Sequence, residues 1–254
     1  VGEDKRVFPG IDGFLIEHVG VVAVIPEIYC KRARREGIKM ERIICLAIGY
    51  LFGMFQTSYI IGKIHHMDIR QYGSGNAGTT NALRTLGKKA GAMTLIGDML
   101  KCVIAILIVD AVFKNRYQEI LPLLGMYTAA GCVLGHNFPF YLGFRGGKGI
   151  AASAGMLLAM DWRVFLICAV IFIGLVAITR YVSLGSMAAY AGALACFIGF
   201  GAAGSYGMDF PHTLEMDVIM GLMTALAIYR HRANIYRLLN GTENKLGAAK
   251  TAAK

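Results

Sequence analysis

Charged side chains are scarce in this sequence. They make up 17% of its 254 residues, whereas 56% of the residues are Ala, Val, Ile, Leu, Met, Phe, Trp, Tyr or Cys. Soluble domains contain about 25% charged residues, and the mean hydropathy here is +0.54. A water-soluble globule of this size could not be covered by so little polar surface, and the same composition excludes intrinsic disorder. The sequence therefore predicts an integral membrane protein.

Several chemical signatures are also missing. The six cysteines form no Cys-x-x-Cys pair, so we expect neither a disulfide framework nor a zinc site. There is no aspartate-rich repeat that would hold magnesium, and no Gly-x-Ser-x-Gly motif, which argues against a serine esterase. We therefore expect no metal and no cofactor. The formal net charge of +10 would suggest a nucleic-acid partner in a soluble protein, but in a membrane protein it indicates basic cytoplasmic loops, so we expect no nucleic acid.

Apolar segments predict an all-α, polytopic helix bundle in the lipid bilayer. A helix needs about 20 apolar residues to cross the hydrocarbon core. The sequence contains seven helical segments, of which six are convincing spans, and the seventh, 149–160, is too short to cross the core. It is either a re-entrant helix or the short first arm of a hairpin with the next segment. The six long segments are 43–62, 90–113, 119–134, 162–179, 182–200 and 215–229.

The distribution of lysine and arginine predicts the orientation. If the loop 63–89 is cytoplasmic, that side of the segments from 43 onward holds fourteen Lys and Arg residues, counting the C-terminal tail, against three on the other side (Lys114, Arg116 and Arg163). Such an excess marks cytoplasmic loops. We therefore expect a multi-pass membrane protein whose long polar loops and C-terminus face the cytoplasm.

The first residues do not fit this scheme. Residues 1–42 contain eight Lys and Arg residues on the side where the orientation expects few. We divide the chain into a leader of unknown role (1–42), a membrane domain (43–245) and a basic C-terminal tail (246–254). Because residues 1–40 lie outside the motifs described below and outside the seven segments, we expect their deletion to leave activity intact.

Three polar clusters follow the predicted spans on the cytoplasmic side. The first, GSGNAGTTNALR at 73–84, alternates glycines with hydroxyl and amide side chains and ends in Arg84. Glycines allow backbone N–H groups to converge on an anion, and a helix N-terminus adds partial positive charge. The pattern is compatible with a phosphate site, but a single stretch of this composition is more often a turn.

The second cluster, GHNFPFYLGFRGGKG at 135–149, brings Arg145 and Lys148 together with glycines at the edge of an apolar segment. It is not a Walker A loop, because no Ser or Thr follows Lys148. The third cluster contains His231 and Asn234, which project from one face of a helix, and continues to Asn244.

Asp98 and Lys101 lie within the apolar segment 90–113. Charges inside a membrane are usually paired and often line a polar site. Two interpretations remain equally open, namely a functional polar site and a pair that only shapes the bundle.

Taken together, these clusters resemble the bacterial acyl-phosphate:glycerol-3-phosphate acyltransferases. The segments that carry the resemblance are GSGNAGTTNALRTLGKKAG at 73–91, Asp98-Met-Leu-Lys101, GHNFPFYLGFRGGKGIAASAG at 135–155 and HRANIYRLLNGTENK at 231–245. The resemblance covers about residues 43–245. Ala77 and Thr79 depart from the residues usual in the family, but neither change removes a polar group.

The resemblance implies a reaction and a site. Such an enzyme transfers a fatty acyl group from acyl-phosphate to the 1-hydroxyl of glycerol 3-phosphate, giving lysophosphatidic acid and phosphate in phospholipid biosynthesis. The donor is already activated, so positioning and charge neutralisation suffice. The implied catalytic residues are His231, Arg84, Lys148 and Ser74. The implied substrate-binding residues are Asn76, Gly78, Thr80, Asn81, Asp98, Lys101, His136, Asn137, Gly146, Gly147, Gly149, Asn234 and Asn244.

Some alternatives remain open at this stage. His231 is the candidate general base, but a phosphate could take the proton instead and leave His231 to bind or orient. A transporter or exchanger of a small anionic solute would also suit a broken helix with intramembrane charges. An acyltransferase that uses acyl-CoA or acyl-carrier protein directly is a third possibility.

Overall fold

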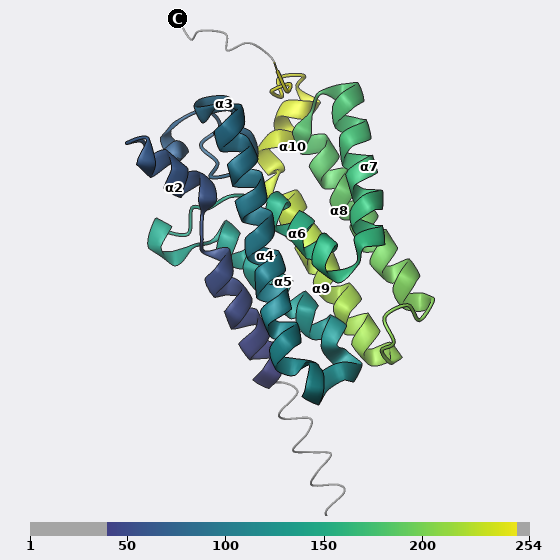
Figure 1. The fold of residues 1–254 in the computed structure, drawn as a ribbon. Coiled ribbons are helices and arrows are strands. Elements are labelled where there is room, and N and C mark those ends of the chain that lie inside the picture. Colours follow the sequence, from purple (N-terminus) through teal and green to yellow (C-terminus); the bar gives the residue numbers. More distant parts are fainter. Residues whose placement is uncertain (1–39, 248–254) are drawn as a thin grey trace, which may run out of the picture. The chain divides into compact units, whose positions relative to one another are not determined.

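The computed structural model describes residues 40–247. Almost all of the predicted leader (1–42) and of the C-terminal tail (246–254) therefore lies outside the described residues. Apart from residues 40–43, the described residues belong to one compact unit, Ile44–Lys254. They form helices and no strand (Figure 1), so the prediction of an all-helical protein is confirmed.

The helices follow one another with short connections. A first helix spans 40–53. It is followed by α2 (Thr57–Ile64), η1 (Ile69–Gln71), α3 (Thr79–Leu86), α4 (Lys88–Tyr117), η2 (Gln118–Ile120), α5 (Leu121–Asn137), η3 (Phe140–Leu142), α6 (Ile150–Met160), α7 (Trp162–Thr179), α8 (Val182–Ala202), α9 (Phe210–Arg230) and α10 (Arg232–Leu239).

Four stretches of the described residues are long and apolar enough to cross a membrane. They are Met40–Ile64, Lys88–Leu142, Trp162–Thr179 and Val182–Ala202. The second stretch contains both α4 and α5. The predicted segments at 90–113, 119–134, 162–179, 182–200 and 215–229 correspond to α4, α5, α7, α8 and α9, with ends that differ by a few residues.

The predicted span 43–62 is not one helix. The first helix ends at Gly53, and α2 begins at Thr57. The interruption leaves the carbonyl groups of Gly53 and Phe55 without helical partners, and both accept hydrogen bonds from the ammonium group of Lys101, at 3.2 and 2.7 Å. Gln56, which is buried at the break, also donates to Gly53. The polar side chains of α4 therefore stabilise a break that hydropathy alone does not reveal.

The short apolar segment is the first arm of a hairpin. α6 has 11 residues, only Asp161 separates it from α7, and it packs against α4, α5 and α7. Its approach to α4 depends on Gly155, where a Cβ would lie 2.2 Å from the carbonyl oxygen of Met99. A larger residue at 155 would force α4 and α6 apart.

Small residues also bring the first helix close to α5. A Cβ at Gly49 would lie 1.9 Å from the carbonyl oxygen of Thr128, and one at Gly131 would lie 2.1 Å from that of Leu46. Gly53 and Gly135 make equally close contacts. Each helix thus carries a Gly-x-x-x-Gly pair, the pattern that allows membrane helices to pack closely.

Large apolar side chains cover the outside of the bundle. Val170 and Ile178 on α7 are 71% and 83% exposed, and Leu222 on α9 is 66% exposed. A soluble protein rarely exposes so much contiguous apolar surface, whereas lipid tails would cover it. α3 and α10 lie at the same end of the unit (Figure 1), and the cavity described below begins there.

Candidate active site

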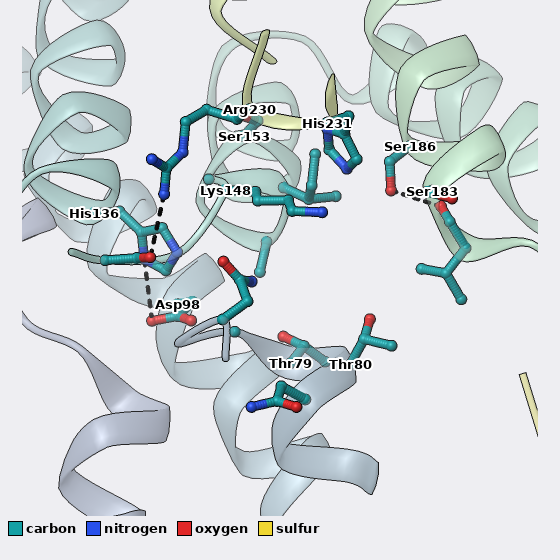
Figure 2. Close-up of a pocket in the computed structure, with 18 of the residues that line it drawn as sticks. Thr79, Thr80, Asp98, His136, Lys148, Ser153, Ser183, Ser186, Arg230 and His231 are labelled. Atoms are coloured by element: carbon teal, nitrogen blue, oxygen red, sulfur yellow. Dashed lines mark hydrogen bonds and ion pairs between the residues drawn. The ribbon is translucent and has the colours of Figure 1, made fainter. Parts of the chain in front are cut away.

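A cavity of about 1310 Å³ joins the three predicted polar clusters. Among the predicted residues, those that line it are Ser74, Asn76, Gly78, Thr80, Asn81, Arg84, Asp98, His136, Gly146, Lys148, Gly149, His231 and Asn234. Segments separated by more than 150 residues in the sequence thus supply one site. Figure 2 shows Lys148 and His231 across the pocket from Thr79 and Thr80.

Four predicted residues do not line this cavity: Lys101, Asn137, Gly147 and Asn244. Lys101 and Asn137 are buried behind it. The side chain of Asn244 is exposed, and its carbonyl group accepts a hydrogen bond from Arg84 at 3.4 Å. Its neighbour Glu243 lines the cavity instead.

The first cluster folds as a loop that leads into the N-terminus of α3. Asn81 holds this loop, because its Oδ1 accepts from the backbone N–H of Ser74 at 2.8 Å and its Nδ2 donates to the carbonyl groups of Ile69 and Tyr72 at 3.0 Å. Its polar atoms are therefore used within the protein. We assign Asn81 to shaping the pocket, while Ser74 remains exposed at the cavity wall.

Two helix N-termini lie at the cavity. Gly78 precedes α3 and Gly149 precedes α6, and both glycines line the cavity. Gly149 has a φ of 83°, a left-handed conformation that favours glycine. The first N–H groups of a helix have no intrahelical partner and favour an anion. The site thus offers two separate anion-binding positions.

The glycine loop itself is held by hydrogen bonds within the protein. The N–H groups of Gly146 and Gly147 donate to the carbonyl groups of Asn137 and His136, at 3.2 and 3.0 Å. The guanidinium of Arg230 donates to the carbonyl groups of the same two glycines, at 3.3 and 2.7 Å. These two glycines therefore fix the position of Lys148 rather than offer free donors to a phosphate.

Lys148 is tied to the third cluster through a chain of hydrogen bonds. Its Nζ donates to Oδ1 of Asn234, and Nδ2 of Asn234 donates to Glu243 at 2.7 Å. Glu243 also accepts from Ser183 at 2.9 Å and from Arg237 at 2.8 Å. One buried carboxylate thus connects α8 and α10 and fixes the orientation of the Asn234 amide.

Burial shifts the pKa values of these groups. It lowers the pKa of Lys148 to about 8, although the attraction of Glu243 opposes the shift. Burial also lowers the pKa of Arg84. For Glu243, burial alone would raise the pKa, but hydrogen bonds from Asn234, Arg237 and Ser183 bring it below its ordinary value. The carboxylate is therefore ionised at neutral pH.

His231 lies where α9 ends and α10 begins, and only 2% of its surface is exposed. Its Nδ1 lies 2.8 Å from the carbonyl oxygen of Ala227, which can only accept, so Nδ1 carries the proton and Nε2 has a free lone pair. Burial, and then the charge of Lys148, lowers the pKa of His231 to about 4. The imidazole is therefore neutral at physiological pH.

The charge of the cavity wall favours anionic ligands. Its acidic side chains are those of Asp68, Asp98 and Glu243, and these three accept hydrogen bonds from Arg70, Lys101 and Arg237 respectively. The basic side chains at the wall are more numerous: Arg70, Arg84, Arg145, Lys148, Arg230, Arg232 and Arg237.

Away from these polar groups, the cavity wall becomes apolar. The lining there comes from α6 (Met156, Leu157), α7 (Phe165, Cys168, Ala169, Phe172), α8 (Ala189, Tyr190, Ala193) and α9 (Met220). Ser153 and Tyr190 share a hydrogen bond across α6 and α8 in this part. From Ser183 to Ala193 the wall of α8 extends about 15 Å along the helix. A polar site thus continues into a long apolar groove.

Several residues at the cavity did not emerge from the sequence. Ser183 and Ser186 are three residues apart in an apolar segment, a spacing that places both on one helix face. Glu243 lies inside the third motif, but its partners are distant in the sequence. Arg230 directly precedes His231 and was attributed only to the basic cytoplasmic side. Hydroxyl groups in an apolar run were the signal available for the two serines.

The intramembrane pair predicted at Asp98 and Lys101 is present, with Nζ 2.9 Å from Oδ1. Thr57 of α2 also donates to Asp98, at 3.0 Å. Both charged side chains are at least 95% buried. Together they hold α2 and the helix break against α4.

Comparison with known proteins identifies the family. The family model described as glycerol-3-phosphate acyltransferase matches residues 43–241. A glycerol-3-phosphate acyltransferase of Clostridioides difficile is 49% identical over 210 residues, which cover 82% of this chain and 97% of the relative. One from Lactiplantibacillus plantarum is 41% identical over 81% of this chain and 92% of its own length.

Solved structures agree with the sequence relatives. A crystal structure of PlsY, described as an integral membrane glycerol 3-phosphate acyltransferase in its glycerol 3-phosphate form, has a TM-score of 0.69 and 34% sequence identity. The match covers 81% of this chain and 96% of the PlsY chain. The lysophosphatidic acid form of PlsY gives a TM-score of 0.67. The helical membrane fold predicted from hydropathy is thus confirmed, and the chain belongs to the glycerol-3-phosphate acyltransferase family.

Proposed function

We propose that this protein transfers a fatty acyl group from acyl-phosphate to the 1-hydroxyl of glycerol 3-phosphate, giving lysophosphatidic acid and inorganic phosphate. The observation that carries the proposal is the shape and chemistry of the cavity. Two helix N-termini and a basic wall lie at one end, and an apolar groove lies at the other. Such a cavity fits two phosphate groups and one acyl chain.

The phosphate groups bind at the polar end. One lies at the N-terminus of α3 near Ser74, Thr80 and Arg84, and the other lies at the N-terminus of α6 near Lys148. A guanidinium binds phosphate oxygens in a bidentate way, whereas an ammonium acts as a mobile point charge. The acyl chain extends along α6, α7 and α8, where the lining is apolar.

The pKa values indicate where the hydroxyl proton goes. The second pKa of a phosphate monoester is about 6, and the pKa of His231 is about 4. The neutral imidazole of His231 is therefore a weak base at physiological pH. In the bound complex His231 therefore accepts a hydrogen bond from the 1-hydroxyl through Nε2 and orients it. As the bond from the hydroxyl oxygen to the acyl carbon forms, the same proton passes to an oxygen of the leaving phosphate.

The reaction balances without a covalent intermediate on the protein. The hydroxyl oxygen forms a bond to the acyl carbon, the bond from that carbon to the phosphate oxygen breaks, and phosphate leaves with the electron pair. Lys148 and the N-terminus of α6 stabilise the negative charge that develops during this transfer. Asn234, fixed by Glu243, keeps Lys148 in place.

The active site and C-terminus face the cytoplasm of a bacterium, and residues 43–245 form the acyltransferase domain. The fourteen Lys and Arg residues that the sequence assigns to the same side as the loop 63–89 support this orientation. A soluble phosphorylated acceptor reaches the polar end from water, and a lipid-like donor enters the groove from the bilayer. We assign no part of the activity to residues 1–42.

The test is to offer the purified protein palmitoyl-phosphate, palmitoyl-CoA and palmitoyl-acyl-carrier protein separately, each with glycerol 3-phosphate. We expect lysophosphatidic acid and phosphate from palmitoyl-phosphate alone. Transfer only from a thioester would overturn the choice of donor. Uptake of glycerol 3-phosphate into proteoliposomes, with no acyl transfer from any donor, would overturn the enzymatic function.

A further inference from the structure

Lys101 donates to a histidine behind the glycine loop. Its three shortest contacts are the carbonyl oxygen of Phe55 at 2.7 Å, Nδ1 of His136 at 2.8 Å and Oδ1 of Asp98 at 2.9 Å. An ammonium group has three donors and no acceptor. Nδ1 of His136 must therefore be the acceptor in this contact, which determines the tautomer of a neutral imidazole. The ring carries its proton on Nε2.

The protonated nitrogen lies beside the glycine loop. A Cβ at residue 147 would lie 2.0 Å from Nε2 of His136, so only glycine allows the loop to approach this edge of the ring so closely. His136 lines the cavity, and among the described residues Nε2 has no hydrogen-bond partner. A donor without a protein partner thus lies at the wall of a cavity that favours anions.

The glycine loop has few other donors to offer. The N–H groups of Gly146 and Gly147 donate within the protein, and their carbonyl groups are held by Arg230. The nearest donors to a phosphate beside this loop then include Lys148, the N-terminus of α6 and Nε2 of His136 at the cavity wall. A neutral N–H adds a directional hydrogen bond to the point charge of Lys148.

We propose that His136 donates a hydrogen bond from Nε2 to the phosphate bound beside the glycine loop, and that Lys101 is the positioning residue that fixes the required tautomer. The proposal rests on the proposed function, which places a phosphate there. It also gives the buried Lys101 and Asp98 a role in the reaction without contact with substrate. Asp98 and the carbonyl groups of Gly53 and Phe55 hold the ammonium beside Nδ1 of His136.

Two amide substitutions at His136 distinguish the roles of the two ring nitrogens. The amide of His136→Gln reaches the position of Nε2, whereas that of His136→Asn reaches the position of Nδ1. We expect His136→Gln to lower kcat/KM by less than about fivefold and His136→Asn to lower it by about 10- to 100-fold, the effect of losing a hydrogen bond to a charged group. The opposite order, or equal losses, would mean that His136 only supports the loop. His65→Asn, at an exposed histidine, is the matched control.

Nuclear magnetic resonance tests the tautomer without catalysis. In wild-type protein labelled with ¹⁵N-histidine, the signal missing from His136→Gln belongs to His136. We expect a protonated Nε2 and an unprotonated Nδ1, and a shift of the Nε2 proton when inorganic phosphate is added. In Lys101→Met the fixed tautomer should be lost, and kcat/KM should fall as in His136→Asn.

The outcomes separate this inference from the proposed function. A protonated Nδ1, or an Nε2 proton that phosphate does not move, would overturn the inference even if acyl transfer is active. If phosphate shifted the signal of the Nε2 proton in a protein that transfers no acyl group, the proposed function would be overturned, but the hydrogen bond from His136 to phosphate would be supported. The tautomer is measured in the wild-type protein, and whichever of His136→Gln and His136→Asn folds is sufficient to assign the His136 signal.

Discussion

The two ends of the cavity are built in different ways. The polar end consists of loops and helix ends, held by side chains that bond to distant backbone groups, as Asn81 and Arg230 do. The apolar end consists of regular helices whose small and apolar residues, such as Ala189 and Ala193, leave space between them. We therefore expect the rate of acyl transfer to depend on the hydrogen-bond network of the polar end, and the choice of acyl chain to depend on the volume of the apolar end. Changes at the first end should alter rate, and changes at the second should alter the choice of substrate.

Lys148→Met should have the largest effect. The change removes a partly buried charge from the site proposed to bind two phosphates, and a hydrogen bond to a charged group contributes about 1.5–3 kcal/mol. Adding the lost stabilisation of the transition state, we expect kcat/KM to fall by about 100- to 1000-fold. Steady-state kinetics with palmitoyl-phosphate measures this loss. Lys89→Met, at an exposed lysine, should change kcat/KM by less than twofold.

His231 tests whether the imidazole orients the hydroxyl or takes its proton. We expect His231→Ala to lower kcat by about 10- to 100-fold and His231→Gln to recover part of the rate, because the glutamine oxygen can accept the hydroxyl hydrogen bond. Such recovery would not occur if the imidazole had to bind the proton. Complete loss of kcat in His231→Gln, in a protein that elutes and melts like the wild type, would assign proton transfer to His231.

The pH dependence provides a third test of the polar end. The pKa of Lys148 is lowered to about 8, so its charge is present below that pH and is lost as the pH rises through it. Because kcat/KM reports the free enzyme, it should decline above about pH 8, approaching tenfold per pH unit. Arginine keeps its charge in this range. Lys148→Arg should lack this alkaline limb, whatever its activity at pH 7, and an unchanged limb would contradict the assignment.

The same difference between the two ends determines what the sequence could predict. The polar residues Ser74, Arg84, Lys148 and His231 stand out because loops rich in glycine and charge interrupt an apolar chain. The apolar groove gives no such signal, since Ala193 and Met220 look like any residue of a membrane helix. Which apolar side chains face a cavity, and which face lipid, depends on how the helices pack.

The break between Gly53 and Thr57 was missed for a related reason. Hydropathy averages over a whole segment, and the interruption is stabilised by Lys101, about fifty residues away in the sequence. Gln56 and Ser58 in an apolar run were the local signal, and both are buried. α3 and α10, which have eight residues each, are too short and too polar for a search for spans to detect.

The smallest effect is expected at the apolar end. Ala193 lines the groove on α8 and is 1% exposed, so phenylalanine there would fill space along the path of the acyl chain. We expect Ala193→Phe to shift the ratio of kcat/KM for lauroyl- over palmitoyl-phosphate by about three- to tenfold towards the shorter chain, since each buried CH₂ contributes about 0.8 kcal/mol and the chain can partly reroute. The KM for glycerol 3-phosphate should stay within twofold, because the phosphate-binding groups at the helix N-termini are unchanged. Ala191→Phe, on an exposed position of the same helix, should leave the ratio unaltered. If Ala193→Phe raised the KM for glycerol 3-phosphate and left chain preference as it was, rate and selection would not be divided between the two ends of the cavity.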